Sequence, residues 1–364
     1  TSKGLDADGI YYESKTDKLY QADRTNNVIN VYEKVNETLL KGEEPKVAYA
    51  STSDFINARE ITAAGDRIVV AEDAIAGNGN KNRLHIYQAE EYGLNRLKSF
   101  DVGINLWGIQ ADINTLYAVV DNSSDLAIFE DFFSNGDGST VVEDKRVTIA
   151  GMVRTHGLYY DYIQDLMILT DIGDAASNSD GALVYIKDFT TKIGDNIITA
   201  EEQIRIAGAA TQLGNPVDVS YDATNGLIYV AERAGGKVLT YTSPLIAGEQ
   251  KPLRVNSFAG VSALYLVGST REGQPTAVAD AIDKENENIY AYPNPANNFI
   301  SISLDKEMKG EVEATIYSQN GQIIGTQSLS NKNNKINVSA LSSGVYFVSI
   351  KGSSINSKVK FVKG

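Results

Sequence analysis

The chain has 364 residues, no cysteine and a formal net charge of −14 at pH 7. The absence of cysteine excludes disulfides, thiolate-bound zinc and cysteine nucleophiles, and the acidic balance disfavours nucleic acid and anionic lipid as partners. No apolar run approaches the roughly 18 residues of a membrane-spanning helix, so we expect a chain that does not span a membrane. The charge is uneven, because residues 290–364 hold eight lysines against four acids.

A repeat of about 50 residues runs through the first part of the chain. Short segments of β-branched and aromatic residues recur, with lead positions Leu19, Ile68, Leu116, Leu166 and Leu227. Each has a similar segment before it and another after a turn, and a fourth is plausible in every unit. Four short antiparallel strands per unit are typical of a propeller blade. We therefore predict an all-β chain in which residues 1–268 form a six-bladed β-propeller.

Five blades are legible, and the sixth begins or ends at 260–268, where the pattern fades. Residues 1–8 look too few to complete that blade, and an open edge strand invites pairing with other chains. We therefore expect the last blade to be incomplete here and an upstream segment to supply its strands. The units resemble the NHL and SMP-30-like propellers, with GLIYVAERAGGKVLTY at 226–241 nearest to the NHL pattern. That resemblance implies an architecture rather than a function, since propellers host enzymes, adhesins and scaffolds.

The residues that open the innermost strands are the candidates for a ligand site. They are Arg59, Glu60, Trp107, His156 and Asp218. If they lie around one mouth of the channel, they place acidic, basic and aromatic groups where a propeller usually binds its ligand. The alternative is that they only cap and order the inner strands.

Several functions remain open for the propeller. It binds a glycan, a peptide or a neighbouring surface protein without catalysis, or it is a metal-dependent hydrolase similar to the SMP-30-like lactonases and esterases. The candidates for the hydrolase site are Glu60, Asp218 and His156. A passive stalk in a larger surface complex is the third reading. No G-x-S-x-G elbow and no phosphate-binding G-x-x-x-x-G-K-[ST] motif is present, so we assign no catalytic residue.

Calcium is the one cofactor that the sequence suggests, and only weakly. Two loops, at 71–83 and 170–182, are rich in Asp, Asn and Gly and could supply oxygen ligands. Neither fits the EF-hand spacing, and both also suit flexible surface turns. The acids that follow the second strands, once per repeat, are better explained by Asx-type turns than by metal sites. These acids are Asp23, Asp73, Asp121, Asp171 and Glu232.

Residues 269–289 have the composition of a linker, and residues 290–364 read as a separate small domain. The prolines of YPNP hold the chain extended before strand alternation begins. Asn320-Gly321 favours a type I′ hairpin. Five to seven short strands in this tail predict a small Ig-like antiparallel β-sandwich.

The tail resembles the type A C-terminal sorting domain of the type IX secretion system of Bacteroidota. The resemblance rests on YPNP, IYSQNGQIIG, LSSGVYFVSIK and KVKFVKG, in that order. It implies export across the periplasm and outer membrane, recognition by the translocon and its shuttle and sortase proteins, and a secreted or cell-surface-attached product. The signature positions that it implies are Tyr292, Pro293, Asn294, Pro295, Gly321, Gly344, Tyr346, Lys360 and Lys363.

Overall fold

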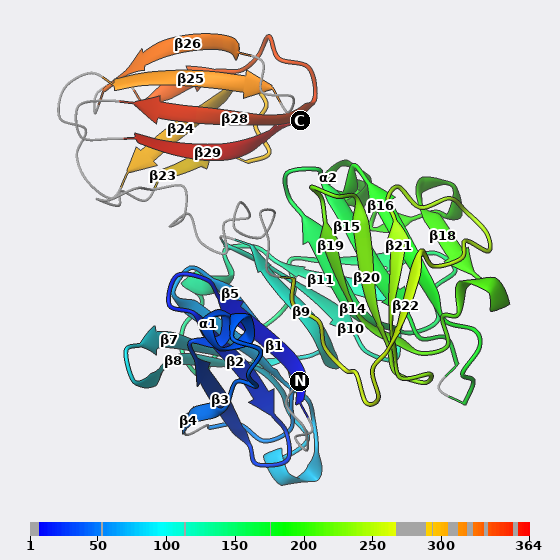
Figure 1. Cartoon of the computed structure of the whole chain (residues 1–364). Helices are drawn as coiled ribbons and strands as arrows, with labels where there is room; N and C mark the ends of the chain where they lie inside the picture. Colours follow the sequence, from blue (N-terminus) through cyan, green and yellow to red (C-terminus); the bar gives the residue numbers. More distant parts are fainter. Residues whose placement is uncertain are drawn as a thin grey trace. The chain divides into compact units, whose positions relative to one another are not determined.

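The structure is a computed structural model that describes residues 7–51, 54–112, 114–174, 176–266, 289–292, 294–304, 312–318, 323–330, 334–351 and 356–364. The chain divides into two compact units, Thr1–Ala277 and Val278–Gly364 (Figure 1). The predicted linker, 269–289, lies outside the described residues except for Ile289, which begins the first strand of the second unit.

Five sheets, which we number as blades 1 to 5, follow one another along the first unit. Blade 1 contains β1 (Ala7–Glu13), β2 (Lys18–Asp23), β3 (Val28–Glu33) and β4 (Val47–Ser51). Blade 2 contains β5 (Ala58–Ala64), β6 (Arg67–Glu72), β7 (Asn82–Glu90) and β8 (Gly93–Val102). Blade 3 contains β9 (Leu106–Asp112), β10 (Thr115–Val120), β11 (Asp125–Phe129) and β13 (Lys145–Ile149). Blade 4 contains β14 (Thr155–Asp161), β15 (Leu166–Asp171), β16 (Ala182–Lys187) and β18 (Ile204–Ala207). Blade 5 contains β19 (Pro216–Asp222), β20 (Leu227–Glu232), β21 (Lys237–Thr242) and β22 (Arg254–Ser257).

Within each blade these four strands pair antiparallel in chain order, as the repeat predicts. Two short strands, β12 (Thr140–Val141) and β17 (Ile197–Ile198), add in parallel to β8 and β13, the outer strands of the preceding blades. Helical turns occupy connections only. They are α1 (Val35–Leu40), α2 (Phe189–Lys192), η1 (Ala76–Asn78), η2 (Phe132–Ser134), η3 (Ile193–Asp195), η4 (Ala200–Glu202) and η5 (Ala209–Thr211). Among the described residues no helix is long and apolar enough to cross a bilayer.

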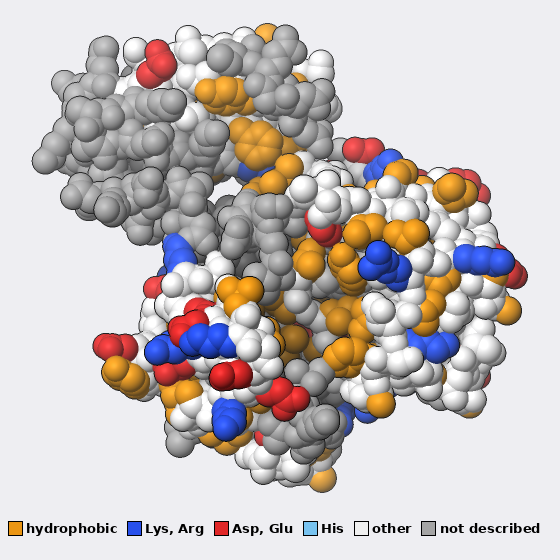
Figure 2. All heavy atoms as spheres, viewed as in Figure 1, with side chains coloured by type: hydrophobic (Ala, Val, Ile, Leu, Met, Phe, Trp, Pro, Cys, Tyr) orange, Lys and Arg blue, Asp and Glu red, His pale blue; other side chains and the backbone are white. Residues whose placement is uncertain are grey.

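The first strands of neighbouring blades lie against one another, β1 on β5, β5 on β9, β9 on β14 and β14 on β19 (Figure 1). Apolar side chains from facing sheets fill the space between blades, so second strands such as β15 are buried along their whole length. This radial stacking of four-stranded sheets is the β-propeller that the repeat predicts. Acidic and basic side chains are interspersed over the face seen in Figure 2.

Residues 258–266 follow blade 5 without forming a strand, although we expected the sixth blade to begin or end here. Leu264 packs with the apolar cluster of blade 5. The ring of Tyr265 meets Tyr11 of blade 1 edge-on, with centroids 5.6 Å apart. The segment therefore contacts both the last and the first blade.

The second unit contains seven strands in two antiparallel sheets. The strands are β23 (Ile289–Tyr292), β24 (Phe299–Leu304), β25 (Val312–Ser318), β26 (Ile323–Leu329), β27 (Lys335–Asn337), β28 (Gly344–Lys351) and β29 (Asn356–Lys363). One sheet has the order β23-β24-β27 and the other β26-β25-β28-β29. Apolar residues of both sheets, such as Ile300 and Val348, share one buried core. This is the predicted β-sandwich.

Several described positions that the resemblance singled out lie where the two ends of the tail meet. The Asn294 side chain accepts a hydrogen bond from the Val362 N–H at 2.7 Å, next to Pro295, and Tyr292 ends β23. Gly344 pairs with Lys363, and Lys360 pairs with Phe347 across β28 and β29. The ring of Tyr346 stacks on Phe361, with centroids 5.6 Å apart. Pro293, Gly321 and the predicted Asn320-Gly321 turn lie outside the described residues.

Candidate ligand site in the propeller channel

Each of the five inner strands has a β-bulge near its start. The antiparallel register is interrupted at Ala7/Gly9, Ala58/Glu60, Thr155/Leu158 and Pro216/Asp218, and in β9 opposite Ala118/Val120. A bulge inserts an unpaired residue and re-aims the side chains beside it. The five residues that the sequence singled out all lie at these bulges. Their side chains therefore need not alternate between the two faces of the sheet, as they would in a regular strand.

Three of the five come together as a stack across successive blades. The Trp107 ring lies parallel to the His156 imidazole, with centroids 3.9 Å apart and an angle of 7°. The Arg59 guanidinium lies 4.4 Å from the centroid of the same indole. Because Arg59 comes from the blade before Trp107 and His156 from the blade after it, the indole is held between them. The faces of the Trp107 indole are therefore covered by these two side chains.

Two ion pairs hold the stack in place. Arg59 donates to Asp73 Oδ2 from Nε at 3.1 Å and Nη2 at 2.9 Å. Arg154 donates to the two oxygens of Asp121 at 2.8 and 3.2 Å. His156 Nε2 lies 3.4 Å from Asp121 Oδ1, and its alignment is too poor for a hydrogen bond.

The buried network shifts the pKa of both partners. Burial lowers the pKa of His156, and the charges of Arg154 and Arg233 act in the same direction, against the attraction of Asp121. Burial by itself would raise the pKa of Asp121, but His156 and Arg154 outweigh it and lower that pKa to about 2. The group is therefore a neutral imidazole beside a carboxylate–guanidinium pair at neutral pH.

Glu60 and Asp218 are not part of that stack. The Glu60 carboxylate accepts the Ile61 N–H at 2.9 Å. The Asp218 carboxylate accepts the Val219 N–H at 2.7 Å and the Leu264 N–H at 2.6 Å. Both carboxylates thus cap backbone donors beside a bulge, and Asp218 also fixes the segment that follows blade 5.

Glycine occupies the equivalent bulge position in the other three blades. A Cβ on Gly108 would lie 2.2 Å from the His156 carbonyl oxygen, and one on Gly157 would lie 2.6 Å from Asp218 Cα. A Cβ on Gly9 would lie 2.3 Å from Glu60 Oε1. Glycine therefore lets neighbouring inner strands approach closely here.

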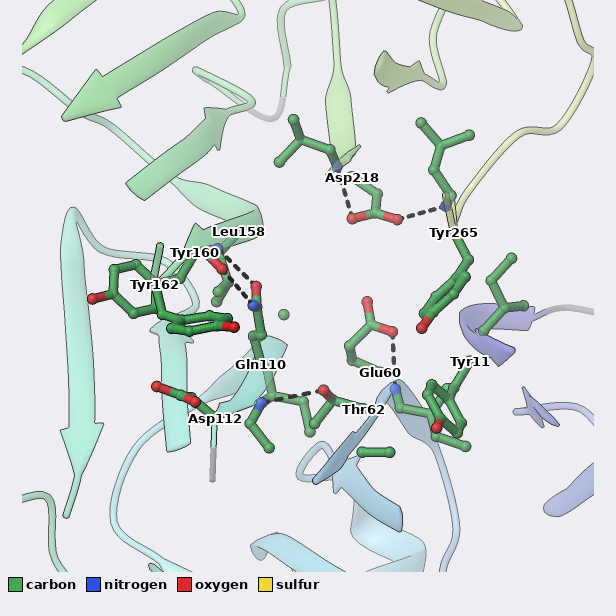
Figure 3. A pocket seen from close by; sticks show the side chains of 18 residues that line it. Tyr11, Glu60, Thr62, Gln110, Asp112, Leu158, Tyr160, Tyr162, Asp218 and Tyr265 are labelled. Atoms are coloured by element: carbon green, nitrogen blue, oxygen red, sulfur yellow. Dashed lines mark hydrogen bonds between the residues drawn. The ribbon is translucent and has the colours of Figure 1, made fainter. Parts of the chain in front are cut away.

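The inner strands and the segment after blade 5 line a cavity of about 60 Å³ (Figure 3). Glu60 and Asp218 line it, and their carboxylates point into the same space in Figure 3. The Gln110 amide bridges two blades through both backbone groups of Tyr160, each at 2.8 Å. Thr62 accepts the Ala111 N–H at 3.1 Å. These cross-blade bonds fix the wall of the cavity.

Sequence reasoning missed part of this wall. Asp112, Tyr160 and Tyr162 come from the far ends of inner strands, and Tyr265 comes from outside the repeats. The first three could have been found by following each inner strand to its end. No repeat signal marks Tyr265, because only folding brings residue 265 back to blade 1.

The acids at the ends of the second strands mostly cap turns, as predicted. Asp23 accepts the N–H groups of Thr25 and Asn26 at 3.0 and 3.1 Å. Glu232 accepts that of Gly235 at 2.7 Å. In blade 2 the equivalent acid is Glu72, which ends β6, rather than Asp73. Asp73 pairs with Arg59 instead.

The two candidate calcium loops are organised by their own side chains. The Asn78 carbonyl oxygen accepts the N–H groups of Ile75 and Lys81, and its amide donates to Glu72 at 2.9 Å. In the second loop Asp180 accepts the Asp174 N–H at 2.9 Å. Within the described ranges no three Asp, Glu or His side chains gather to hold a metal ion, and Glu60, Asp218 and His156 form no such group.

Comparison with protein families identifies the tail. Residues 290–364 match the family described as "Secretion system C-terminal sorting domain". The tail is a type IX secretion sorting domain. The protein is therefore export cargo that is secreted or reaches the cell surface, and its sorting domain interacts with the secretion machinery.

The propeller gains no such assignment. No curated protein matches the chain. Among solved structures, one from a nidogen/laminin complex is similar at 14% identity and TM-score 0.47, covering 71% of this chain and 87% of that one. A periplasmic gluconolactonase of Pseudomonas aeruginosa is similar at 11% and 0.39, covering 95% and 92%. A putative 6-phosphogluconolactonase of Bacteroides fragilis is similar at 10% and 0.42, covering 98% and 94%.

Proposed function

We propose that the propeller of this exported protein is a non-catalytic binding module. Its ligand, the end of a glycan or peptide, passes the mouth formed by Arg59, Trp107 and His156 and enters the cavity lined by Glu60 and Asp218. The sorting domain delivers the module to the cell exterior, where such a ligand is met.

The observation that supports this most directly is the bulge repeated on all five inner strands, beside the cavity that these strands line. Bulges concentrate next to functional sites because they re-aim side chains. Concave, largely pre-formed sites with a few fixed polar groups are typical of ligand binding. Binding without catalysis agrees with the way Glu60 and Asp218 accept backbone N–H groups.

The test is to fill the cavity and measure capture of ligands from glycan and peptide arrays by the full chain. Ile10 lines the cavity and is half-buried, so Ile10→Trp places an indole in that space. Val47→Trp on β4, where the side chain is 42% exposed, is the matched control. We expect wild type and control to capture the same ligand and Ile10→Trp to lose at least about tenfold in affinity.

Far-UV circular dichroism and the melting temperature verify that Ile10→Trp folds. If a folded Ile10→Trp captured every ligand as well as wild type did, the binding site would lie elsewhere and the proposal would fail.

A further inference from the structure

The wall of the cavity combines negative charge with aromatic rings. Its carboxylates are those of Glu60, Asp112 and Asp218, which belong to blades 2, 3 and 5. No lysine, arginine or histidine is among the described residues that line it. A low-dielectric wall with charges of one sign favours a ligand group of the opposite sign.

Four tyrosines complete the wall: Tyr11, Tyr160, Tyr162 and Tyr265. Burial raises the pKa of Tyr160 well above its ordinary value, and Tyr117 and Asp165 act in the same direction. Burial, followed by Asp112, also raises the pKa of Tyr162. These phenols therefore stay neutral, and neutral aromatic rings attract cations through their negative faces. The Tyr160 ring packs on Tyr117 and Phe189, and the Tyr11 ring stacks on Tyr20. Tyr162 and Tyr265 are therefore the lining rings that favour a cation beside the carboxylates.

The arrangement fits an organic ammonium better than a metal ion. Asp218 accepts backbone N–H groups with both carboxylate oxygens, and the Glu60 carboxylate accepts the Ile61 N–H. The carboxylates lie around the wall rather than converging, since no three acidic or histidine side chains of the described residues form a metal-binding group. A hard metal ion needs several converging oxygens. An ammonium needs only nearby negative charge and aromatic surface.

The size of the cavity limits the group that enters it. A space of about 60 Å³ holds about four water molecules at roughly 15 Å³ each. An aminomethyl or methylammonium end fits this space. A larger ligand would therefore place only its amino end in the cavity, with the remainder at the mouth.

We propose that the cavity binds the ammonium group of an amine ligand, held by the carboxylates of Glu60, Asp112 and Asp218 and by the rings of Tyr162 and Tyr265. This inference rests on the proposed function and names the chemical class of its ligand. It assigns the cavity as the recognition point and the stack at Trp107 as part of the entrance.

The test compares three probes of one chain length on the full protein: propylamine hydrochloride, 1-propanol and sodium propionate, at constant ionic strength. A ligand that binds only the folded state raises the melting temperature in a saturable way. We expect this rise with propylammonium alone, and we expect Ile10→Trp to abolish it. Calcium chloride is the fourth probe.

Charge-removing variants locate the site. Glu60→Gln keeps an oxygen for the Ile61 N–H and removes the charge. Asp112→Asn removes the charge of a second carboxylate, in blade 3. We expect each to weaken propylammonium binding at least about fivefold, because one carboxylate near a cation contributes about 1 kcal/mol or more. Glu44→Gln, at an exposed position in the connection before β4, is the control and leaves affinity unchanged.

The outcomes separate the two proposals. If propionate or propanol stabilises the protein and Ile10→Trp abolishes the effect, the site is right and the ammonium inference is wrong. A calcium-induced rise that Glu60→Gln removes would overturn the inference in favour of a metal site. If no probe binds and array capture survives Ile10→Trp, both proposals fail.

Discussion

The indole of Trp107 and the imidazole of His156 lie face to face with 3.9 Å between centroids, although they belong to different blades. His156 is 5% exposed. Both residues are at bulges of their inner strands. The stack therefore depends on the relative position of two blades. It reports on how the inner strands of blades 3 and 4 are placed, and Trp107 is the one tryptophan in the chain.

His156 should make stability fall as the pH drops. Burial lowers its pKa below 6.5 in the folded protein, so the unfolded chain takes up a proton first. Its contribution is present above pH 6.5 and is lost as the pH falls through the folded pKa. Urea unfolding followed by Trp107 fluorescence, from neutral pH to about pH 5, measures this loss.

His156→Phe keeps a ring on Trp107 and cannot titrate, so its stability should fall less over that range. If the free energy of unfolding fell equally with pH in wild type and His156→Phe, His156 would not be the group responsible for the loss.

Asp121→Asn should destabilise the propeller by about 2 kcal/mol near neutral pH, since a pKa lowered from 3.8 to about 2 corresponds to that free energy. The contribution is present above pH 3.8 and disappears as the pH falls toward 2. Chemical unfolding at neutral and acidic pH measures it. Asp195→Asn, at an exposed position in η3, is the control. If both variants lost the same free energy of unfolding, the ion pair between Arg154 and Asp121 would not stabilise the fold.

The sequence predicts the blades well because each strand repeats a local signal. Alternating apolar residues and a turn after each strand recur every blade, so β2, β6, β10, β15 and β20 follow from the repeat. The end of the repeat is harder to read. Leu264 and Tyr265 pack on blades 5 and 1 without forming a strand, and no local pattern indicates such a contact.

The candidate site is predictable in part for the same reason. Unusual residues at the starts of inner strands draw attention to Arg59, Trp107 and His156, and folding does bring those three together. Their partners Asp73 and Asp121 come from the turns of second strands, and repetition alone suggested only turn capping for them. Which cavity wall a side chain reaches depends on bulges, which a strand pattern does not show.

Gly108→Ala should destabilise the propeller by roughly 1–3 kcal/mol, because the new Cβ would meet the His156 carbonyl and force the inner strands of blades 3 and 4 apart. Gly103→Ala is the matched control, since no atom lies within 4 Å of its added Cβ. The difference in urea midpoint between the two variants measures the effect. Equal midpoints would mean that the close approach at Gly108 relaxes at no cost.

Asn78→Ala should cost roughly 1–3 kcal/mol, because it leaves the buried Glu72 oxygen and several loop backbone groups without their partner. Burial by itself would raise the pKa of Glu72, and hydrogen bonds from His85 and Asn78 hold it below its ordinary value. Asn95→Ala, exposed on β8, serves as the control. If added calcium restored the stability of Asn78→Ala to that of wild type, the loop would be a metal site after all.

Deleting residues 290–364 should stop export without unfolding the propeller. The tail is a sorting domain with its own buried core, and the two units are compact separately. In a host with a type IX system, we expect the truncated chain to accumulate inside the outer membrane while the full chain reaches the surface or the medium. Fractionation and immunoblotting measure this distribution.

A milder variant, Asn294→Ala, removes the side chain that accepts the Val362 N–H and ties the two ends of the tail together. Export of Asn294→Ala should fall in proportion to the folded fraction of the tail. Normal export of the truncated chain would show that the signal lies outside residues 290–364.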